Sequence, residues 1–260
     1  MENKEILIEL KNAVAIIYLH RPQVYNSFNR TMSLELQKAL DQCEANQDLR
    51  AVIITGYGKA FCAGQDLSEA TSVDGPTIET IINEHYNPIV RRIHNLSKPV
   101  VAVVNGVAAG AGANLALCCD IILASEEAVF IQAFSKIGLI PDTGGTYFLP
   151  RLIGLQRAMA LCMTADKVTA SQAMQMGLVY QTYPTDQLQE MALSFANQLA
   201  AMPTQALVLT KKALRNSFSN SLDAQLNLEL KLQIQAAATE DFKEGIEAFL
   251  QKRKPNFKGK

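Results

Sequence analysis

The stretch Lys98–Ile121, KPVVAVVNGVAAGAGANLALCCDI, decides the fold class of this chain. A run of β-branched residues comes first, three glycines interspersed with alanines follow, and Asp120 is the only charge after Lys98. The β-branched run predicts a buried strand over 100–104, the glycines predict a tight turn, and the apolar segment 112–120 predicts a buried helix. Glycines and asparagines interrupt the apolar run, so it does not suit a membrane span. A strand, a turn and a helix in immediate succession are typical of an α/β fold.

The same alternation continues on both sides of this stretch. Two apolar segments near the start predict a hairpin that turns at Lys11-Asn12. Other apolar patterns predict strands over 51–55, 121–124 and 129–132 and helices over 31–45 and 78–96, while the polar segment 66–76 predicts a mobile loop. We place His85 and His94 on a helix surface, where a lone histidine is usually solvated. Buried strands that alternate with helices predict an α/β architecture in which helices cover the sheets.

The character of the chain changes after about residue 155, where helical patterns dominate. The expected helices cover residues 155–163, 171–176, 185–202, 203–217, 221–237 and 239–253. The segment 221–237 carries more leucine and isoleucine than one helix face can hide. Such a helix either lies deep in the protein or packs against another subunit.

Composition excludes several classes of protein. The 260 residues are 48% hydrophobic and 19% charged, with a net charge of −1, which is ordinary for a soluble enzyme and gives no global reason to expect a nucleic-acid partner. Five cysteines without a CxxC pair, in a chain without a secretory signal, predict free thiols and a cytoplasmic location. The tail Lys252–Lys260 has five cationic residues in nine. It is either a solvated basic end or an anchor for a polyanionic ligand.

Three segments carry candidate chemistry. In Ile137–Gly145, IGLIPDTGG, Asp142 stands among apolar residues, where burial raises the proton affinity of a carboxylate. Phe61–Leu67, FCAGQDL, and the glycines of Val104–Cys119 predict two turns that aim backbone N–H groups at a ligand. Together these parts can polarise a carbonyl and move a proton beside it. Asp142 could instead cap the turn that follows it, but we favour catalysis, because the segment offers few other acids.

No GxSxG or HExxH motif and no Cys/His cluster at metal-ligand spacing occurs in the sequence. Serine-hydrolase and zinc-protease chemistry therefore lack support, and we expect no metal site and no redox cofactor.

The order of these segments resembles the enoyl-CoA hydratase/isomerase, or crotonase, superfamily along nearly the whole chain. The matching segments are LHRPQVYNSF (19–28), AVIITGYGKAFCAGQDL (51–67), KPVVAVVNGVAAGAGANLALCCDI (98–121), FSKIGLIPDTGGTYFLPRLIG (134–154) and EGIEAFLQKRKPNF (244–257). The resemblance implies a crotonase-like spiral of repeated β-β-α units over residues 1–200 that holds an acyl-CoA site. It also implies a C-terminal helical region, 201–260, that forms a trimer or a dimer of trimers and covers the CoA.

The resemblance further implies an acyl-CoA thioester substrate, of which coenzyme A is a part, and neither a nucleic-acid nor a membrane partner. By position, the backbone N–H groups of Gln65 and Ala111 would form the oxyanion hole, and Asp142 would be catalytic. The other residues expected to contact substrate or CoA are Ala63, Gly64, Asp66, Leu67, Gly110, Asn114, Phe134, Lys254, Phe257 and Lys258. Among these, Asp66 lies on a polar segment nearer the mouth and is expected to be mainly structural.

One departure from the superfamily pattern concerns the acids. The two glutamates of enoyl-CoA hydratases fall at Asn114 and Phe134, neither of which is acidic. Within the superfamily the chain resembles the ring-1,2-epoxyphenylacetyl-CoA isomerases of phenylacetate degradation, which keep an aspartate at the position of Asp142. That resemblance implies opening of the ring epoxide to an oxepin thioester, a Δ3–Δ2 double-bond shift in enoyl-CoA, or both. An enoyl-CoA hydratase and a non-catalytic acyl-CoA-binding homologue stay open as alternatives.

Overall fold

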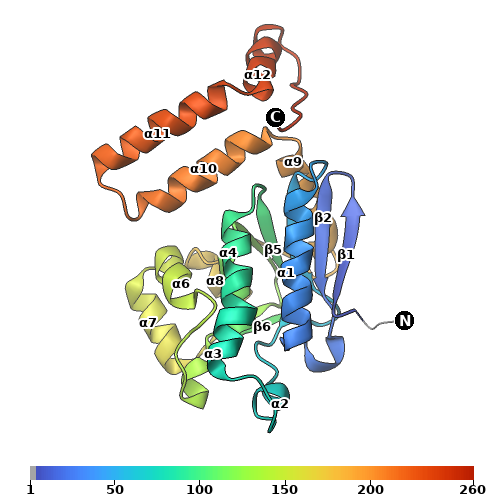
Figure 1. The fold of residues 1–260 in the computed structure, drawn as a ribbon, viewed down its shortest axis with the longest axis vertical. Coiled ribbons are helices and arrows are strands. Elements are labelled where there is room, and N and C mark those ends of the chain that lie inside the picture. The colour runs from blue at the N-terminus through green and yellow to red at the C-terminus, as the bar shows by residue number, and fades with distance from the viewer. Residues whose placement is uncertain (1–3) are drawn as a thin grey trace.

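The computed structural model describes residues 4–260, so residues 1–3 of the predicted core lie outside the described residues. Two sheets form the centre of the molecule, a six-stranded one ordered β1-β2-β3-β5-β7-β10 and a four-stranded one ordered β4-β6-β8-β9 (Figure 1). The strands are β1 Ile6–Lys11, β2 Val14–Leu19, β3 Ala51–Gly56, β4 Ala60–Cys62, β5 Val100–Val104, β6 Val107–Ala109, β7 Ile121–Ser125, β8 Val129–Ile131, β9 Lys167–Thr169 and β10 Gln181–Tyr183. β1 and β2 form the predicted antiparallel hairpin, and the rest of the larger sheet is parallel.

The chain winds between the two sheets in repeated β-β-α units. In each of the pairs β3/β4, β5/β6 and β7/β8, the first strand joins the larger sheet, the second joins the smaller one, and helical segments follow. The helices of this part are α1 Arg30–Ala45, α2 Leu67–Ala70, α3 Ile78–Thr80, α4 Asn87–Asn95, α5 Ala111–Cys118, α6 Gly145–Ile153, α7 Leu155–Thr164, α8 Ala170–Gln175 and α9 Leu188–Ala200. A π-helical turn, Ile81–Tyr86, joins α3 to α4, and a 3-10 turn, Ala133–Ile137, precedes the loop to α6. The predicted α/β spiral of β-β-α units is confirmed.

Hydrophobic packing covers both faces of the larger sheet. One face packs under α1, α4 and α5, and the other packs against α9, which presents Leu188, Ala192 and Ala196 four residues apart. All eight residues of α5 are buried, which explains why this helix carries no charge. The helix lies so close to β4 that a Cβ at Gly112 would stand 2.2 Å from the Cys62 carbonyl oxygen, so only glycine fits there.

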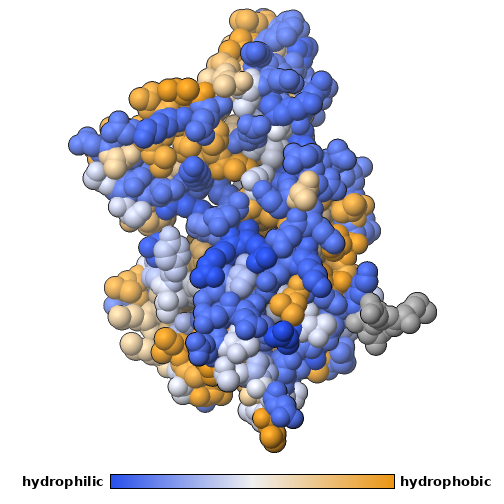
Figure 2. All heavy atoms as spheres, in the orientation of Figure 1, coloured by the Kyte–Doolittle hydropathy of each residue, from blue (hydrophilic) through white to orange (hydrophobic). Residues whose placement is uncertain are grey.

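The last three helices project from this body as an arm made of α10 Thr204–Ser217, α11 Leu222–Ala237 and α12 Glu240–Leu250 (Figure 1). α10 is fastened to the body by Lys211 and Arg215, which each donate to the Asp120 carboxylate at 2.8 Å. Leu222, Leu226, Leu230 and Ile234 of α11 are each more than half exposed. Hydrophobic side chains accordingly gather over the arm in Figure 2. The division of roles between residues 1–200 and 201–260 stays a prediction.

Some expectations were wrong in detail. Residues 66–76 were expected to be a loop, but α2 forms there, because the Asp66 side chain accepts the Ser68 N–H and caps the helix. His85 was expected to be solvated, but it is only 1% exposed, because the helix that carries it packs against α1. The pattern missed β4, β6, β9 and β10, which are three residues long and too short for a readable period.

Within residues 4–260, none of the helices combines the length and the apolar character that crossing a bilayer requires.

Candidate active site

Two backbone turns, one at the end of β4 and one at the start of α5, touch each other. Gly64 has a φ of +95°, and a Cβ placed on it would lie 2.9 Å from the Ala109 carbonyl oxygen and 3.5 Å from the Ala111 nitrogen. A side chain at position 64 would therefore push the two turns apart. Glycine permits both the left-handed conformation and the close approach.

The two predicted N–H donors are free in this arrangement. The Phe28 N–H donates to the Gly64 carbonyl and the Asp66 N–H donates to the Phe28 carbonyl, so the groups of Gln65 between them point away from Phe28. Ala111 is the first residue of α5, where an N–H has no partner within its own helix. Among residues 4–260, neither the Gln65 N–H nor the Ala111 N–H donates a hydrogen bond. Unpaired N–H groups at buried positions are rare, and Ala111 is only 3% exposed.

The main chain of Asp142 is hydrogen-bonded to Asn114, which lies one helical turn after Ala111 on α5. The Asn114 side chain donates to the Asp142 carbonyl oxygen at 2.8 Å, and the Gly145 N–H donates to the same oxygen at 2.8 Å. The Thr143 hydroxyl donates to Asp142 Oδ1 at 2.8 Å. The Asp142 backbone is thus fixed by the helix that also presents one of the free N–H groups.

The environment of Asp142 changes its acidity. Burial raises the pKa of Asp142 above its ordinary value, and the hydrogen bond from Thr143 offsets part of that rise. A carboxylate with a raised pKa is a better proton acceptor near neutral pH. A partly buried carboxylate with a raised pKa meets the chemical requirement for a general base.

The two positions where hydratases carry glutamates have other roles here. Asn114 is fully buried, and its Oδ1 accepts from Gln132 at 2.8 Å while its amide holds Asp142. Phe134 is 6% exposed, and its ring tip would lie 3.9 Å from a Cβ at Gly110. Both residues shape the site, and neither supplies a carboxylate.

Ala63, Gly64 and Gly110 belong to the two turns, whereas Asp66 and Leu67 lie at their edge. The Asp66 carboxylate accepts from Ser68 and, at 2.9 Å, from Arg21. Burial acts to raise the pKa of Asp66, but these hydrogen bonds and the Arg21 charge hold it below the ordinary value. Asp66 therefore stays ionised and holds α2. Leu67 is 53% exposed at the start of that helix.

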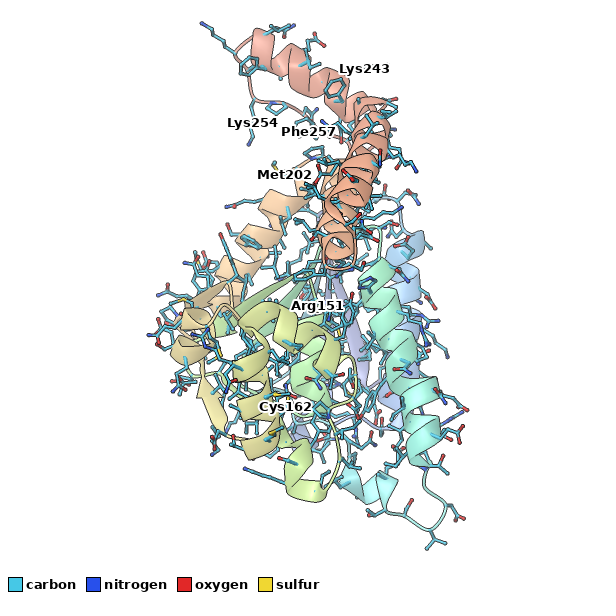
Figure 3. All side chains as sticks on the ribbon, turned by 90° about the vertical axis from the view of Figure 1, so that its left-hand side faces the viewer. Arg151, Cys162, Met202, Lys243, Lys254 and Phe257 are labelled. Atoms are coloured by element: carbon cyan, nitrogen blue, oxygen red, sulfur yellow. The ribbon has the colours of Figure 1, made fainter. Side chains whose placement is uncertain are left out.

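The tail residues Lys254, Phe257 and Lys258 lie elsewhere. They lie beside α12, at the end of the molecule opposite α2 (Figures 1 and 3). The segment is folded, because the N–H groups of Lys258 and Gly259 donate to Asp241 at 2.6 and 2.7 Å. Phe257 is half-buried, and its ring would lie 3.5 Å from a Cβ at Gly245. Within one chain the structure does not bring the tail to Asp142.

Sequence patterns missed one polar residue in this region. The Tyr86 hydroxyl donates to Gln65 Oε1 at 2.5 Å, and the Tyr86 side chain is 1% exposed. The sequence holds no motif around Tyr86 that would have marked it, because its position depends on the π-helical turn.

Comparison with known proteins places these features in a family. The sequence profile of the enoyl-CoA hydratase/isomerase family matches residues 9–260, so the chain belongs to that family. It is 44% identical over 259 residues to a 1,2-epoxyphenylacetyl-CoA isomerase of Escherichia coli K12, covering 98% of each chain. It is also 43% identical over 260 residues to a probable enoyl-CoA hydratase of Rhodobacter capsulatus, covering 100% of each.

The fold agrees with this assignment. The crystal structure of a putative enoyl-CoA hydratase/isomerase from Mycobacterium abscessus superimposes with a TM-score of 0.93 at 37% identity, covering 98% of this chain and 100% of that one. The protein is therefore a crotonase-fold enzyme of the hydratase/isomerase family, for which an acyl-CoA substrate is expected.

Proposed function

We propose that the chain is an acyl-CoA isomerase in which Asp142 moves a proton while the free N–H groups of Gln65 and Ala111 stabilise a thioester enolate. The observation that carries the proposal is the pair of touching turns with two N–H groups that are unpaired among residues 4–260, together with Asp142, whose pKa is raised and whose main chain is hydrogen-bonded to Asn114, one helical turn along α5 from Ala111. Preorganised backbone donors of this kind contribute about 3–4 kcal/mol each to comparable transition states.

The proton balance for a β,γ-unsaturated thioester is simple. The Asp142 carboxylate removes a proton from the α-carbon, and the C–H electron pair moves toward the thioester carbonyl, whose oxygen becomes negative between the two N–H groups. The carboxylic acid then returns the proton to the γ-carbon. The γ-carbon binds this proton with the electron pair of the β,γ double bond, the enolate C=C pair becomes the α,β double bond, the oxygen pair re-forms the carbonyl, and Asp142 is ionised again.

For the acyl group, we propose the ring-1,2-epoxide of phenylacetyl-CoA, which would open to a seven-membered oxepin thioester. Similarity to the E. coli isomerase supports this substrate class. Phe134 and Tyr86 supply buried aromatic surface beside the turns.

Enoyl-CoA hydration is the second candidate, because the relative from Rhodobacter capsulatus bears that description. Gln132 Oε1 is buried without a hydrogen-bond partner among residues 4–260, so it is an acceptor on which a water could bind. Asn114 and Phe134 cannot ionise, and for that reason we place isomerisation first.

We also propose that the protein needs no metal or redox cofactor and works as a trimer or a dimer of trimers, with the basic tail near the CoA of a neighbouring subunit. A tail that lies beside α12, at the end of the molecule opposite α2, supports a role between subunits.

The test is turnover of the phenylacetyl-CoA epoxide and of a β,γ-unsaturated acyl-CoA in ¹⁸O-labelled water. Isomerised product without ¹⁸O supports the proposal, and hydroxyacyl product with ¹⁸O supports the hydratase. Binding of both thioesters without any product would mean that the chain is a non-catalytic acyl-CoA-binding protein.

A further inference from the structure

Tyr86 is a buried polar residue that the proposed proton transfer does not use. It is the last residue of the π-helical turn Ile81–Tyr86, and its ring packs edge-on against Phe28 with centroids 5.6 Å apart. Its hydroxyl donates to Gln65 Oε1 at 2.5 Å. A π-helical turn shifts the residues that follow it relative to an uninterrupted α-helix, and such turns recur at functional sites.

Tyr86 and Phe28 both contact the segment 64–66. Phe28 pairs with it through the backbone, at Gly64 and Asp66, whereas Tyr86 holds the Gln65 side chain. The other side-chain contacts of Gln65 are long, 3.4 Å to the Asp66 carbonyl and 3.5 Å to Glu69. The Tyr86 hydroxyl is therefore the short contact that fixes the Gln65 side chain.

We infer that Tyr86 is a positioning residue for the thioester site, which acts through the Gln65 side chain to hold the Gln65 N–H on the substrate carbonyl. This inference rests on the proposed function. The geometry supports it, since among residues 4–260 Phe28 is the only sheet partner of residues 64–66, and the Tyr86 hydroxyl adds a short contact on the Gln65 side chain between those two backbone bonds.

Tyr86 is not a second proton carrier. Burial, together with the charges of Asp142, Cys62 and Glu69, raises the pKa of the Tyr86 hydroxyl well above its ordinary value, so the phenol keeps its proton. That proton is engaged with Gln65 Oε1.

The main test is Tyr86→Phe, which keeps the ring against Phe28 and removes only the hydroxyl. Tyr18→Phe is the matched control, because Tyr18 also loses a hydroxyl hydrogen bond, to Glu9 at 3.1 Å, but on the outer hairpin. For Tyr86→Phe we expect kcat to fall about tenfold and KM to change less than about twofold, the pattern of an interaction made in the transition state. Tyr18→Phe should leave both unchanged.

A spectroscopic measurement separates this inference from the proposed function. A saturated acyl-CoA with a ¹³C-labelled carbonyl, bound to Asp142→Asn protein, should show a C=O stretch below its frequency in water. Adding Tyr86→Phe should reduce that displacement. If the parent protein fails to isomerise thioesters while the displacement still depends on Tyr86, the proposed function is overturned and the role of Tyr86 is supported.

A double variant tests whether Tyr86 acts through Gln65. Gln65→Leu alone should cost about as much kcat as Tyr86→Phe, and the two together should cost no more than either. Losses that multiply in the double variant, or a Tyr86→Phe protein with unchanged kcat and unchanged carbonyl frequency, would overturn the inference.

Discussion

Thr143 occupies an unusual backbone conformation next to the proposed base. Its φ is +49°, in the left-handed region that a β-branched residue rarely adopts, and its side chain is 3% exposed. The surrounding turn keeps it there, and the hydroxyl in return donates to Asp142 Oδ1 at 2.8 Å. Strain of this kind persists where neighbouring contacts over-determine the backbone.

Replacing Thr143 should change the pH dependence of catalysis. Thr143→Val keeps the branched shape but removes a hydrogen bond that lowers the pKa of Asp142, so that pKa should rise further. Activity needs ionised Asp142, and it should therefore begin to fall at a higher pH on the acid side. The profile of kcat/KM against pH measures this, with Thr143→Ser as the control that keeps the hydroxyl. Identical acid limbs for the valine and serine variants would contradict the assignment.

At the scale of elements, the helical segment 78–95 buries the imidazole of His85. Burial lowers the pKa of His85, and both ring nitrogens lack a hydrogen-bond partner among residues 4–260. Unfolded His85 binds a proton near pH 6.5, as model peptides do, whereas the folded protein binds it only at lower pH. The free energy of unfolding should therefore decrease as pH falls from about 6.5 toward the folded pKa, because protons favour the unfolded state in that window.

His85→Gln should make this decrease shallower, since glutamine does not titrate. Urea unfolding at pH 7.5 and 5.5 provides the comparison, and His94 is retained in both proteins so that the difference reports His85. Equal slopes in the two proteins would show that His85 is not the group responsible.

The folded tail yields a second prediction at this scale. Arg253 is engaged with Glu244 at 2.6 and 2.9 Å, so the charges to remove are Lys252, Lys254 and Lys258. Their replacement by alanine should raise KM for CoA thioesters several-fold and leave kcat nearly unchanged, because phosphate contacts bind substrate and transition state alike. Lys243→Ala on α12 is the control. If the triple variant and the parent have the same KM, and salt changes KM in neither protein, the tail is only a solvated end.

Sequence patterns predicted the long elements and missed what depends on contacts between distant segments. The strand–turn–helix unit at 98–121 was predictable, because an apolar run with glycines and no charge between Lys98 and Asp120 has few alternatives. The two turns were also predictable, since each stands in a local motif, and the catalytic role of Asp142 stays a prediction. The burial of His85 and the Tyr86–Gln65 bond could not be found, because a π-helical turn sets both. The path of the tail could not be predicted either, because it depends on a hydrogen bond to Asp241, seventeen residues before Lys258.

At the scale of the whole molecule, the arm exposes more apolar surface than a lone subunit would keep. Leu226 and Leu230 of α11 are 53% and 60% exposed, and Phe249 of α12 is 82% exposed. A separate apolar cavity of about 410 Å³ lies between α6 and α10, and Arg151, which Figure 3 labels, is one of its lining residues. Contiguous exposed apolar surface usually marks a protein–protein interface.

We expect the protein to be a trimer or larger at micromolar concentration. Light scattering should give a mass of at least three times the 28.5 kDa of one chain. Leu226→Glu combined with Leu230→Glu should lower that mass, because charges would face the partner subunit. A parent protein that scatters as a single chain would contradict this prediction.

The central claim is that Asp142 carries the proton. The most direct measurement is the rate of conjugated-thioester formation from a β,γ-unsaturated acyl-CoA, followed by ultraviolet absorbance, for the parent and Asp142→Asn. Asparagine keeps the size and hydrogen bonding of the side chain but cannot carry a proton, so kcat should fall by at least about 10³-fold while acyl-CoA binding stays nearly intact. An Asp142→Asn protein that retains most of its kcat would contradict the account.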